Sequence, residues 1–206
     1  MEANFDEKDS LRVINEMIAQ AQNNFQKGSA DPTVFSGYVV AFTAIANFVL
    51  LNVLERPILS FHVWWFMIPM VLVSRYIGRK NAIKAQVRTQ LERLISTVWT
   101  AHLFACITIL LVIWSGNRIF DTSYFGVLIT PTILSFTGMA QFISARAIRI
   151  KAYYYASFVY WLGALGCMAV CSVNMWHYQF LILAACSILG LAVPGHVLNR
   201  KAKKHV

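Results

Sequence analysis

The sequence predicts an all-α fold: a polytopic membrane helical bundle with six transmembrane helices, arranged as three hairpins, preceded by a cytosolic amphipathic helix. Hydrophobic residues make up 58% of the 206-residue chain and charged residues 13%, whereas about a quarter of the residues of a soluble domain are charged. Six apolar stretches have close to the roughly 20 residues that a membrane-spanning helix needs. Basic residues collect in every second loop between these stretches, which places most of them on one side of the membrane, as expected of membrane hairpins.

The pattern divides the chain into three parts. Residues 1–30 form a cytosolic amphipathic helix segment, residues 31–198 form a six-span transmembrane domain with a basic cytosolic loop at 75–93, and residues 199–206 form a basic cytosolic tail. The first part is polar and acidic, unlike the basic and then apolar start of a signal sequence. We therefore expect the first span to insert as an uncleaved anchor.

Residues 7–27 predict the amphipathic helix. Leu11, Ile14, Ile18, Ala21 and Phe25 recur at steps of three and four, which places them on one helical face. Over residues 1–27, five acidic residues (Glu2, Asp6, Glu7, Asp9 and Glu16) stand against three basic ones. A helix that lies on an anionic lipid surface usually has the opposite charge. The segment therefore favours a protein surface as its docking site.

The six spans and their flanking charges predict the orientation. The spans are residues 34–54, 58–78, 94–114, 124–144, 152–173 and 178–198. Sixteen of the 18 Lys and Arg residues fall on the side that holds both termini, and only Arg56 and Arg118 fall in the opposite loops. Because cytosolic loops are enriched in Lys and Arg, we expect a multi-pass protein of the inner (plasma) membrane with both termini in the cytosol. The outer turns are too short to form a ligand-binding ectodomain.

Spans two and three are expected to continue as helix beyond the membrane, because residues 79–93 contain no Gly or Pro and repeat apolar residues at helical spacing. Their basic face could pack against the acidic N-terminal helix and form a cytosolic interaction surface. The candidate residues of this surface are Leu11, Ile14, Ile18, Phe25, Lys80, Lys84 and Arg88. In the alternative interpretation the two segments are solvated separately, and the charges only determine topology.

Span four is unusually polar and predicts an intramembrane polar site. The candidate residues are His102 of span three and Thr130, Pro131, Ser135, Thr137 and Gln141 of span four. A mid-membrane imidazole needs a hydrogen-bond partner, and we expect His102 to find one among Ser135, Thr137 and Gln141. Two interpretations stay open: the polar groups join helices to one another, or they line a ligand pocket.

A proline occurs in each even-numbered span. Pro69, Pro131 and Pro194 are 62 and 63 residues apart, which is compatible with three hairpin repeats. The first basic residue after Pro131 is farther along the chain than the first basic residue after Pro69 or Pro194. Pro131 is therefore expected at a different membrane depth. Regular hairpin length is therefore the alternative explanation.

The spans carry few groups suited to chemistry. They contain no acidic residue, which argues against a proton- or sodium-coupled transporter. The sequence also lacks an H-E-x-x-H motif, a G-x-S-x-G elbow, a P-loop and a dinucleotide fingerprint. The four cysteines lie in apolar runs and are read as small apolar residues. We predict no enzyme, cofactor or metal, and no direct contact with nucleic acid, because topology accounts for the net charge of +9.

One segment resembles a known group of proteins. The run from Leu11 to Phe25, followed by Phe35-Ser36-Gly37-Tyr38, is similar to the opening of small uncharacterised multi-pass membrane proteins of Bacteroidetes-type bacteria. Those relatives tend to have Trp-Gly where this chain has Ser36-Gly37. The resemblance implies a bacterial inner-membrane protein, and a regulatory role because such proteins are often encoded near small winged-helix regulators.

Two classes of function follow from these observations. The first is a non-enzymatic regulatory or interaction protein that acts through its cytosolic face, with the lipid bilayer, a cytosolic protein and a second copy of the chain as possible partners. The alternative is a small transporter or channel for a neutral or lipophilic solute, with the polar span four and the even-span prolines as hinges.

Overall fold

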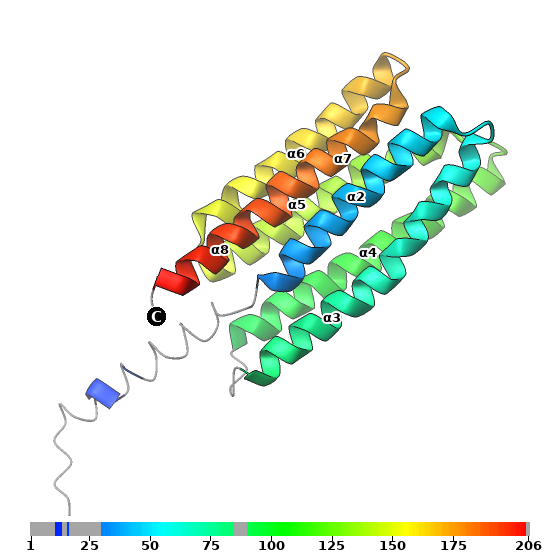
Figure 1. Ribbon diagram of the computed structural model, residues 1–206. Coiled ribbons are helices and arrows are strands. Elements are labelled where there is room, and N and C mark those ends of the chain that lie inside the picture. The colour runs from blue at the N-terminus through cyan, green and yellow to red at the C-terminus, as the bar shows by residue number, and fades with distance from the viewer. Residues whose placement is uncertain (1–10, 14–15, 17–29, 85–89, 205–206) are drawn as a thin grey trace, which may run out of the picture.

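The computed structural model describes residues 11–13, 16, 30–84 and 90–204. Within these residues the chain is almost entirely helical and has no strands, and the long helices run up and down as one bundle (Figure 1). The helices are α2 (Asp31–Val53), α3 (Met67–Lys84), α4 (Gln90–Ile119), α5 (Ile129–Ile148), α6 (Lys151–Ser172), α7 (Gln179–Ser187) and α8 (Val193–Lys204). The predicted all-α, six-span bundle is confirmed.

Six helical segments are long and apolar enough to cross a membrane. They are Asp31–Val53, Ile58–Lys80, Arg93–Ile119, Tyr124–Ile148, Lys151–Ser172 and Trp176–Arg200. They have 22 to 27 residues, so at about 1.5 Å per residue each exceeds the roughly 30 Å of a hydrocarbon core. Each overlaps its predicted span, and the chain is a multi-pass membrane protein.

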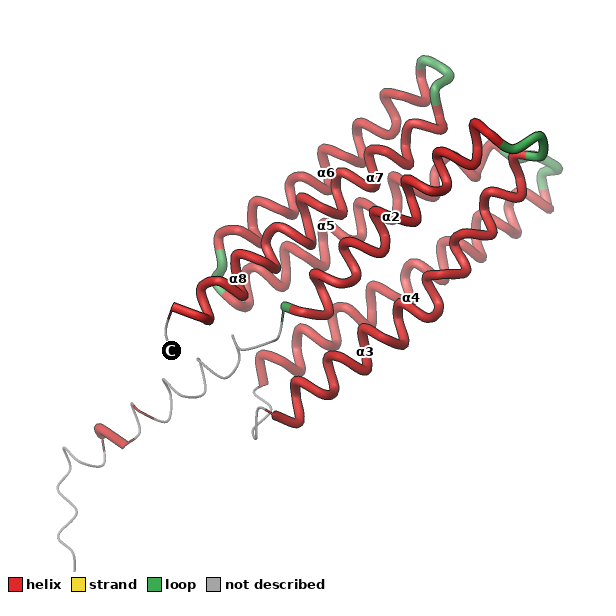
Figure 2. Tube along the Cα trace, viewed as in Figure 1, coloured by secondary structure: helices red, strands yellow, loops and turns green. Residues whose placement is uncertain are grey.

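The helices meet at two ends of the bundle. At the end that we name the terminal end, α2 begins, α8 ends, and α5 turns into α6 (Figure 1). At the opposite end, the loop end, three loops join the spans (Figure 2). Each even-numbered span starts there with a 3₁₀ segment: η1 (Pro57–Phe66), η2 (Tyr124–Leu128) and η3 (Trp176–Tyr178). Asp121 and Asn174 have positive φ angles in two of these loops, a conformation that Asp and Asn tolerate better than most residues.

Four spans form a central core, and two lie at its edge. α5 and α6 pack closely together, while α2 packs along α7 and the π-helical segment η4 (Ile188–Ala192) that joins α7 to α8. α3 is held mainly through α2, and α4 mainly through α5. Accordingly, 56% of the most apolar part of the last span is buried within the protein, compared with 6% of that part in span two and 0% in span three. The exposed apolar faces of α3 and α4 are therefore available for contact with lipid.

Small residues let the core helices approach closely. A Cβ atom on Gly37 of α2 would lie 2.9 Å from the Cβ atom of Leu191 and 3.0 Å from the backbone nitrogen of Ala192. Ala41 and Ala44 continue this surface, and both are buried in the main core cluster. Close backbone contact of this kind is the usual source of helix association in lipid, where apolar burial contributes little.

At the terminal end, helices extend beyond the predicted spans. α3 continues to Lys84 and α4 starts at Gln90, in agreement with the expected helical continuation of spans two and three. α8 continues to Lys204, so the described part of the predicted basic tail 199–206 is helical.

Candidate functional site

The central polar contact of the bundle joins spans four and six. Gln141 of α5 is completely buried, and its Nε2 atom donates a 3.0 Å hydrogen bond to the carbonyl oxygen of Gly190. In an α-helix the donor to this carbonyl would be the N–H group of residue 194, but that residue is Pro194, which has no N–H. Gln141 therefore supplies a donor to a carbonyl that residue 194 cannot serve.

A local change of helix type accompanies this contact. Residues Ile188–Ala192 form the π-helical segment η4, in the middle of span six. The ring of Tyr160 from α6 packs against Gly190 so closely that a Cβ atom there would lie 2.3 Å from Cε2 of the ring. Glycine at position 190 thus leaves space for the ring of Tyr160, and the Gly190 carbonyl accepts the hydrogen bond from Gln141.

A second proline contact runs in the reverse direction. Gln179, at the start of α7, is buried and donates a 3.2 Å hydrogen bond from Nε2 to the carbonyl oxygen of Val127. Val127 belongs to the 3₁₀ segment η2 and lies four residues before Pro131, which has no N–H group to donate to this carbonyl. The Nε2 atom of Gln179 also contacts Sγ of Cys171.

The two contacts are reciprocal. A glutamine of span four bonds the carbonyl four residues before the proline of span six, and a glutamine of span six bonds the carbonyl four residues before the proline of span four. Freed carbonyls in lipid must be satisfied by neighbouring groups because no water is present to bond them. Hydrogen bonds therefore join spans four and six at two places. The helices of these spans, α5 and α7, both pack against α6.

The hydroxyl groups of the predicted polar site have local partners. Oγ of Ser135 donates to the carbonyl of Pro131 and Oγ1 of Thr137 donates to that of Ile133, both at 2.8 Å within α5. Thr130 and Pro131 are buried in the same helix. The geometry supports helix-to-helix contact as the role of Gln141, and backbone bonding as the role of the hydroxyls.

His102 is not part of this cluster. Its imidazole lies 3.6 Å (Nε2) and 3.9 Å (Nδ1) from Sγ of Cys106, one turn along α4, and its ring meets Trp99 edge to face at 5.5 Å. The expected pairing of His102 with Ser135, Thr137 or Gln141 is therefore wrong. The reason is that α4 lies at the edge of the bundle, where its polar groups bond within their own helix.

Several buried polar atoms have no hydrogen-bond partner among the described residues. They include Oε1 of Gln141, Oη of Tyr160, both amide atoms of Asn47 and Oγ of Ser60. Gln141 and Tyr160 both contact Gly190, so unsatisfied groups gather where span six is π-helical. Such groups carry a cost of about 1–3 kcal/mol each.

A shallow hollow lies on α4 and is separate from this cluster. Its lining residues are Ser96, Thr97, Thr100, Ala101 and Phe104. All five come from one helix, and the side chains of Thr97 and Thr100 donate to carbonyls of that helix. The hollow is a surface depression beside α4 and does not involve the polar residues of span four. No group of three or more His, Cys, Asp and Glu side chains gathers to hold a metal ion within the described residues.

Only part of the expected cytosolic interaction surface can be placed. Leu11 is helical and 60% exposed, and Lys80 is exposed near the end of α3. Lys84 is the last residue of α3. Ile14, Ile18, Phe25 and Arg88 lie outside the described residues, so docking of residues 7–27 onto the basic loop remains a prediction.

Sequence reasoning missed three members of the central cluster: Gln179, Tyr160 and Gly190. Gln179 could have been singled out from the sequence, because a glutamine inside an apolar span must find a hydrogen-bond partner. The partner itself was not readable, because Val127 lies 52 residues away along the chain.

Fold and site together define a six-span α-helical membrane protein whose core is joined by glutamine–carbonyl bonds at two prolines. Comparison of the chain with protein-family models, curated proteins and solved structures finds no match. The resemblance to multi-pass proteins of Bacteroidetes-type bacteria therefore has no support from these comparisons and stays a prediction.

Proposed function

We propose that this chain is a non-enzymatic protein of the inner (plasma) membrane that binds a protein partner at its terminal end, which faces the cytosol. The observation that carries the proposal is the extension of α3 and α4 beyond the apolar part of their spans. Arg75, Arg79 and Lys80 of α3 and Arg93 of α4 are exposed there. A pair of helices with exposed bases fits a partner with an acidic surface, because complementary potentials guide association.

The interior of the bundle supports the same function. The polar side chains of spans four and six bond carbonyls of the protein itself, which suits a structural role. Specific recognition is then left to residues outside the membrane. The assignment of the terminal end to the cytosolic side rests on the distribution of Lys and Arg, because 16 of the 18 fall on the side that holds both termini.

The proposal is tested by site-specific photo-crosslinking in cells. A photo-reactive residue replaces Arg79 or Arg93 in two variants, and Leu72, which is 65% exposed on the lipid-facing part of α3, in a control. We expect one protein adduct that is shared by positions 79 and 93 and absent at position 72. Adducts with lipid alone at all three positions would contradict the proposal, and an adduct of twice the chain mass would identify a second copy as the partner.

A truncated chain tests the predicted role of the N-terminal helix. Residues 28–206 should give a weaker adduct at position 79 if residues 1–27 help to bind the partner. An adduct of unchanged yield would limit the binding surface to the ends of α3 and α4.

A small carrier for a neutral or lipophilic solute is the second candidate, and the π-helical segment η4 favours it. Such segments often occur at functional sites, and η4 lies in the middle of span six. A rocking motion at Pro131 or Pro194 would have to break the bonds from Gln179 and Gln141. Carrier activity predicts that Gln141→Leu changes solute flux in liposomes, whereas a purely structural bond predicts a change in stability alone.

A further inference from the structure

The turn between α5 and α6 places three bases together at the terminal end. Arg146 is in the last turn of α5, Arg149 forms the turn itself with a φ angle of 55°, and Lys151 is the first residue of α6. All three side chains are exposed. The turn joins two membrane-spanning segments directly, so it lies at the level of the lipid headgroups.

The turn is a rigid platform. Ile150 and Tyr153 are 8% and 5% exposed and pack in a second core cluster with Ala30, Ala145 and Leu198. This cluster anchors the turn to the start of α2 and to α8. The three bases therefore have fixed backbone positions, which lowers the entropy lost when they bind a ligand.

Arg146 is held in place by two aromatic rings. Its Cζ atom lies 5.2 Å from the ring centroid of Tyr154 and 5.6 Å from that of Phe142, within the range of cation–π attraction. The Arg146 side chain is still exposed beside these rings, so its N–H groups are available to a ligand. An arginine edge is well suited to bind phosphate through two parallel hydrogen bonds.

No acidic side chain neutralises the cluster within the described residues. The ion pair observed among the described residues joins Arg12 and Glu16, and neither residue belongs to this turn. Asp31 follows Ala30 of the second core cluster and accepts a 2.9 Å hydrogen bond from Asn199. The turn thus presents three positive charges to an anion.

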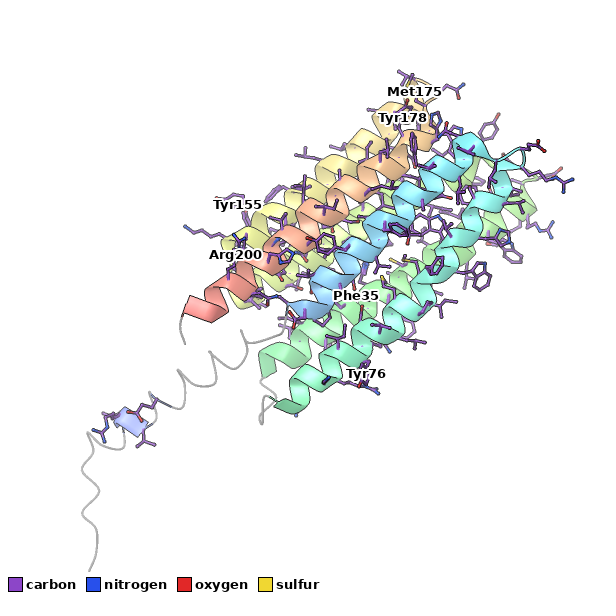
Figure 3. All side chains as sticks on the ribbon, in the orientation of Figure 1. Phe35, Tyr76, Tyr155, Met175, Tyr178 and Arg200 are labelled. Carbon is purple, nitrogen blue, oxygen red and sulfur yellow. The ribbon has the colours of Figure 1, made fainter. Side chains whose placement is uncertain are left out.

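An aromatic ladder leads from the turn toward the membrane interior. Ring centroids are 5.5 Å apart for Phe142 and Tyr154, 5.2 Å for Tyr154 and Phe158, and 5.4 Å for Phe158 and Trp161. Phe158 is 40% exposed, and Tyr155 beside it is 65% exposed and points away from the bundle (Figure 3). A polar headgroup at the turn would have its acyl chains beside these rings.

We propose that the α5–α6 turn binds the phosphate group of an anionic glycerophospholipid, with Arg146, Arg149 and Lys151 around the phosphate and the aromatic ladder along the acyl chains. Basic pockets between membrane helices are known to hold anionic headgroups. The lipid would act as a bound component of the α5–α6 hairpin. This proposal is independent of a protein partner at α3 and α4.

Native mass spectrometry of the full chain in detergent tests the proposal, with phosphatidylglycerol as the anionic probe and phosphatidylcholine, whose choline cation cancels the phosphate charge, as the zwitterionic comparison. We expect Arg146→Gln with Arg149→Gln to weaken phosphatidylglycerol binding about thirty-fold, which corresponds to about 2 kcal/mol for two charges. Phosphatidylcholine binding should not change. The matched control is Arg79→Gln with Lys80→Gln, which removes the same charge at the same end of the bundle. An equal loss in the control would overturn the site and leave only a general basic surface.

Two further measurements address the geometry and the source of the phosphate. Tyr154→Leu removes one ring beside Arg146 and should weaken binding several-fold without changing charge, while Arg146→Lys should fall between wild type and Arg146→Gln. Unchanged binding in Tyr154→Leu would contradict the role of the rings. Inorganic phosphate at the concentration of the lipid should not displace phosphatidylglycerol, and equal competition would overturn the lipid as ligand. An unchanged helical circular dichroism spectrum and gel-filtration profile show that each variant is folded.

Discussion

The side-chain amide of Gln141 donates a 3.0 Å hydrogen bond to the carbonyl of Gly190, on a different membrane span 49 residues away. Pro194, four residues later, has no N–H group to donate to this carbonyl. Gln179 serves the carbonyl of Val127 in the same way, four residues before Pro131. Two prolines that weaken their own helices thus become the points at which spans four and six are joined.

Gln141→Leu should destabilise the protein. The change keeps a long side chain but leaves the Gly190 carbonyl without its donor, and interhelical hydrogen bonds in membranes contribute about 0.6 kcal/mol on average and about 1.7 at most. We expect a loss of about 1 kcal/mol in the free energy of unfolding, measured by SDS titration in mixed micelles. Thr137→Val is the control, because that hydroxyl bonds its own helix. Equal stability of Gln141→Leu and wild type would show that the bond has no net effect.

The proline and the glutamine should be energetically coupled. Pro194→Ala restores an N–H group at position 194, so the carbonyl of Gly190 no longer depends on Gln141. In the Pro194→Ala background, Gln141→Leu should therefore cost less than in the wild-type background, and a double-mutant cycle measures the difference. The same relation should hold for Pro131→Ala and Gln179→Leu. Strictly additive effects in both cycles would contradict this account.

Gly190→Ala should be strongly unfavourable. The added methyl group would lie 2.3 Å from Cε2 of Tyr160, and overpacking of this kind typically costs about 1–3 kcal/mol. Gly166→Ala is the matched control, since its Cβ atom would meet Cδ1 of Ile182 at an ordinary 3.7 Å. Thermal unfolding in detergent distinguishes them, and Tyr160→Leu should partly rescue Gly190→Ala. A Gly190→Ala protein as stable as Gly166→Ala would refute the close contact.

Tyr160→Phe should leave stability unchanged or raise it. Oη of Tyr160 is buried and has no hydrogen-bond partner among the described residues, so its removal relieves a desolvation cost of about 1–3 kcal/mol. The ring and its contact with Gly190 are retained. The melting temperature of the detergent-solubilised protein is the measurement. A clear fall would mean that the hydroxyl group binds a partner, such as a buried water molecule.

The terminal end should be on the cytosolic side. In intact cells a membrane-impermeant maleimide should label Asn174→Cys at the loop end, whereas Arg149→Cys at the terminal end should react only after permeabilisation. The parent protein is the control for the native cysteines, of which Cys167 and Cys186 are buried. The distribution of Lys and Arg is the physical reason, and the reverse labelling pattern would contradict it.

The membrane architecture could be predicted from the sequence because it depends on local composition. Each span is a continuous apolar stretch, and a helix is the structure in which such a stretch satisfies its own backbone in lipid. The spans were therefore placed close to the observed helices without knowledge of any contact. The extension of α3 and α4 beyond the membrane was predictable for the same reason, since no Gly or Pro interrupts residues 79–93.

The site could be predicted only in part. Gln141 was expected to be important, because a buried amide in lipid needs a partner, but its partner was sought in His102. Sequence separation gives no measure of which spans are neighbours, and α4 proved to be a peripheral helix that packs mainly on α5. Gly190 could be read from the sequence only as one of the small residues that support close packing in span six, because its specific role depends on the Tyr160 ring of another helix.

The sequence by itself determined that this is a six-span helical membrane protein, because hydropathy and the position of charges act on each segment separately. The tertiary structure alone decided that Gln141 meets Gly190 and that Gln179 meets Val127, because a carbonyl freed by proline can accept a donor from any neighbouring helix. Packing around α6 selected spans four and six as that pair. It also gathered Arg146, Tyr154 and Phe142 at one turn, where a charge and two rings from adjacent helices became one surface.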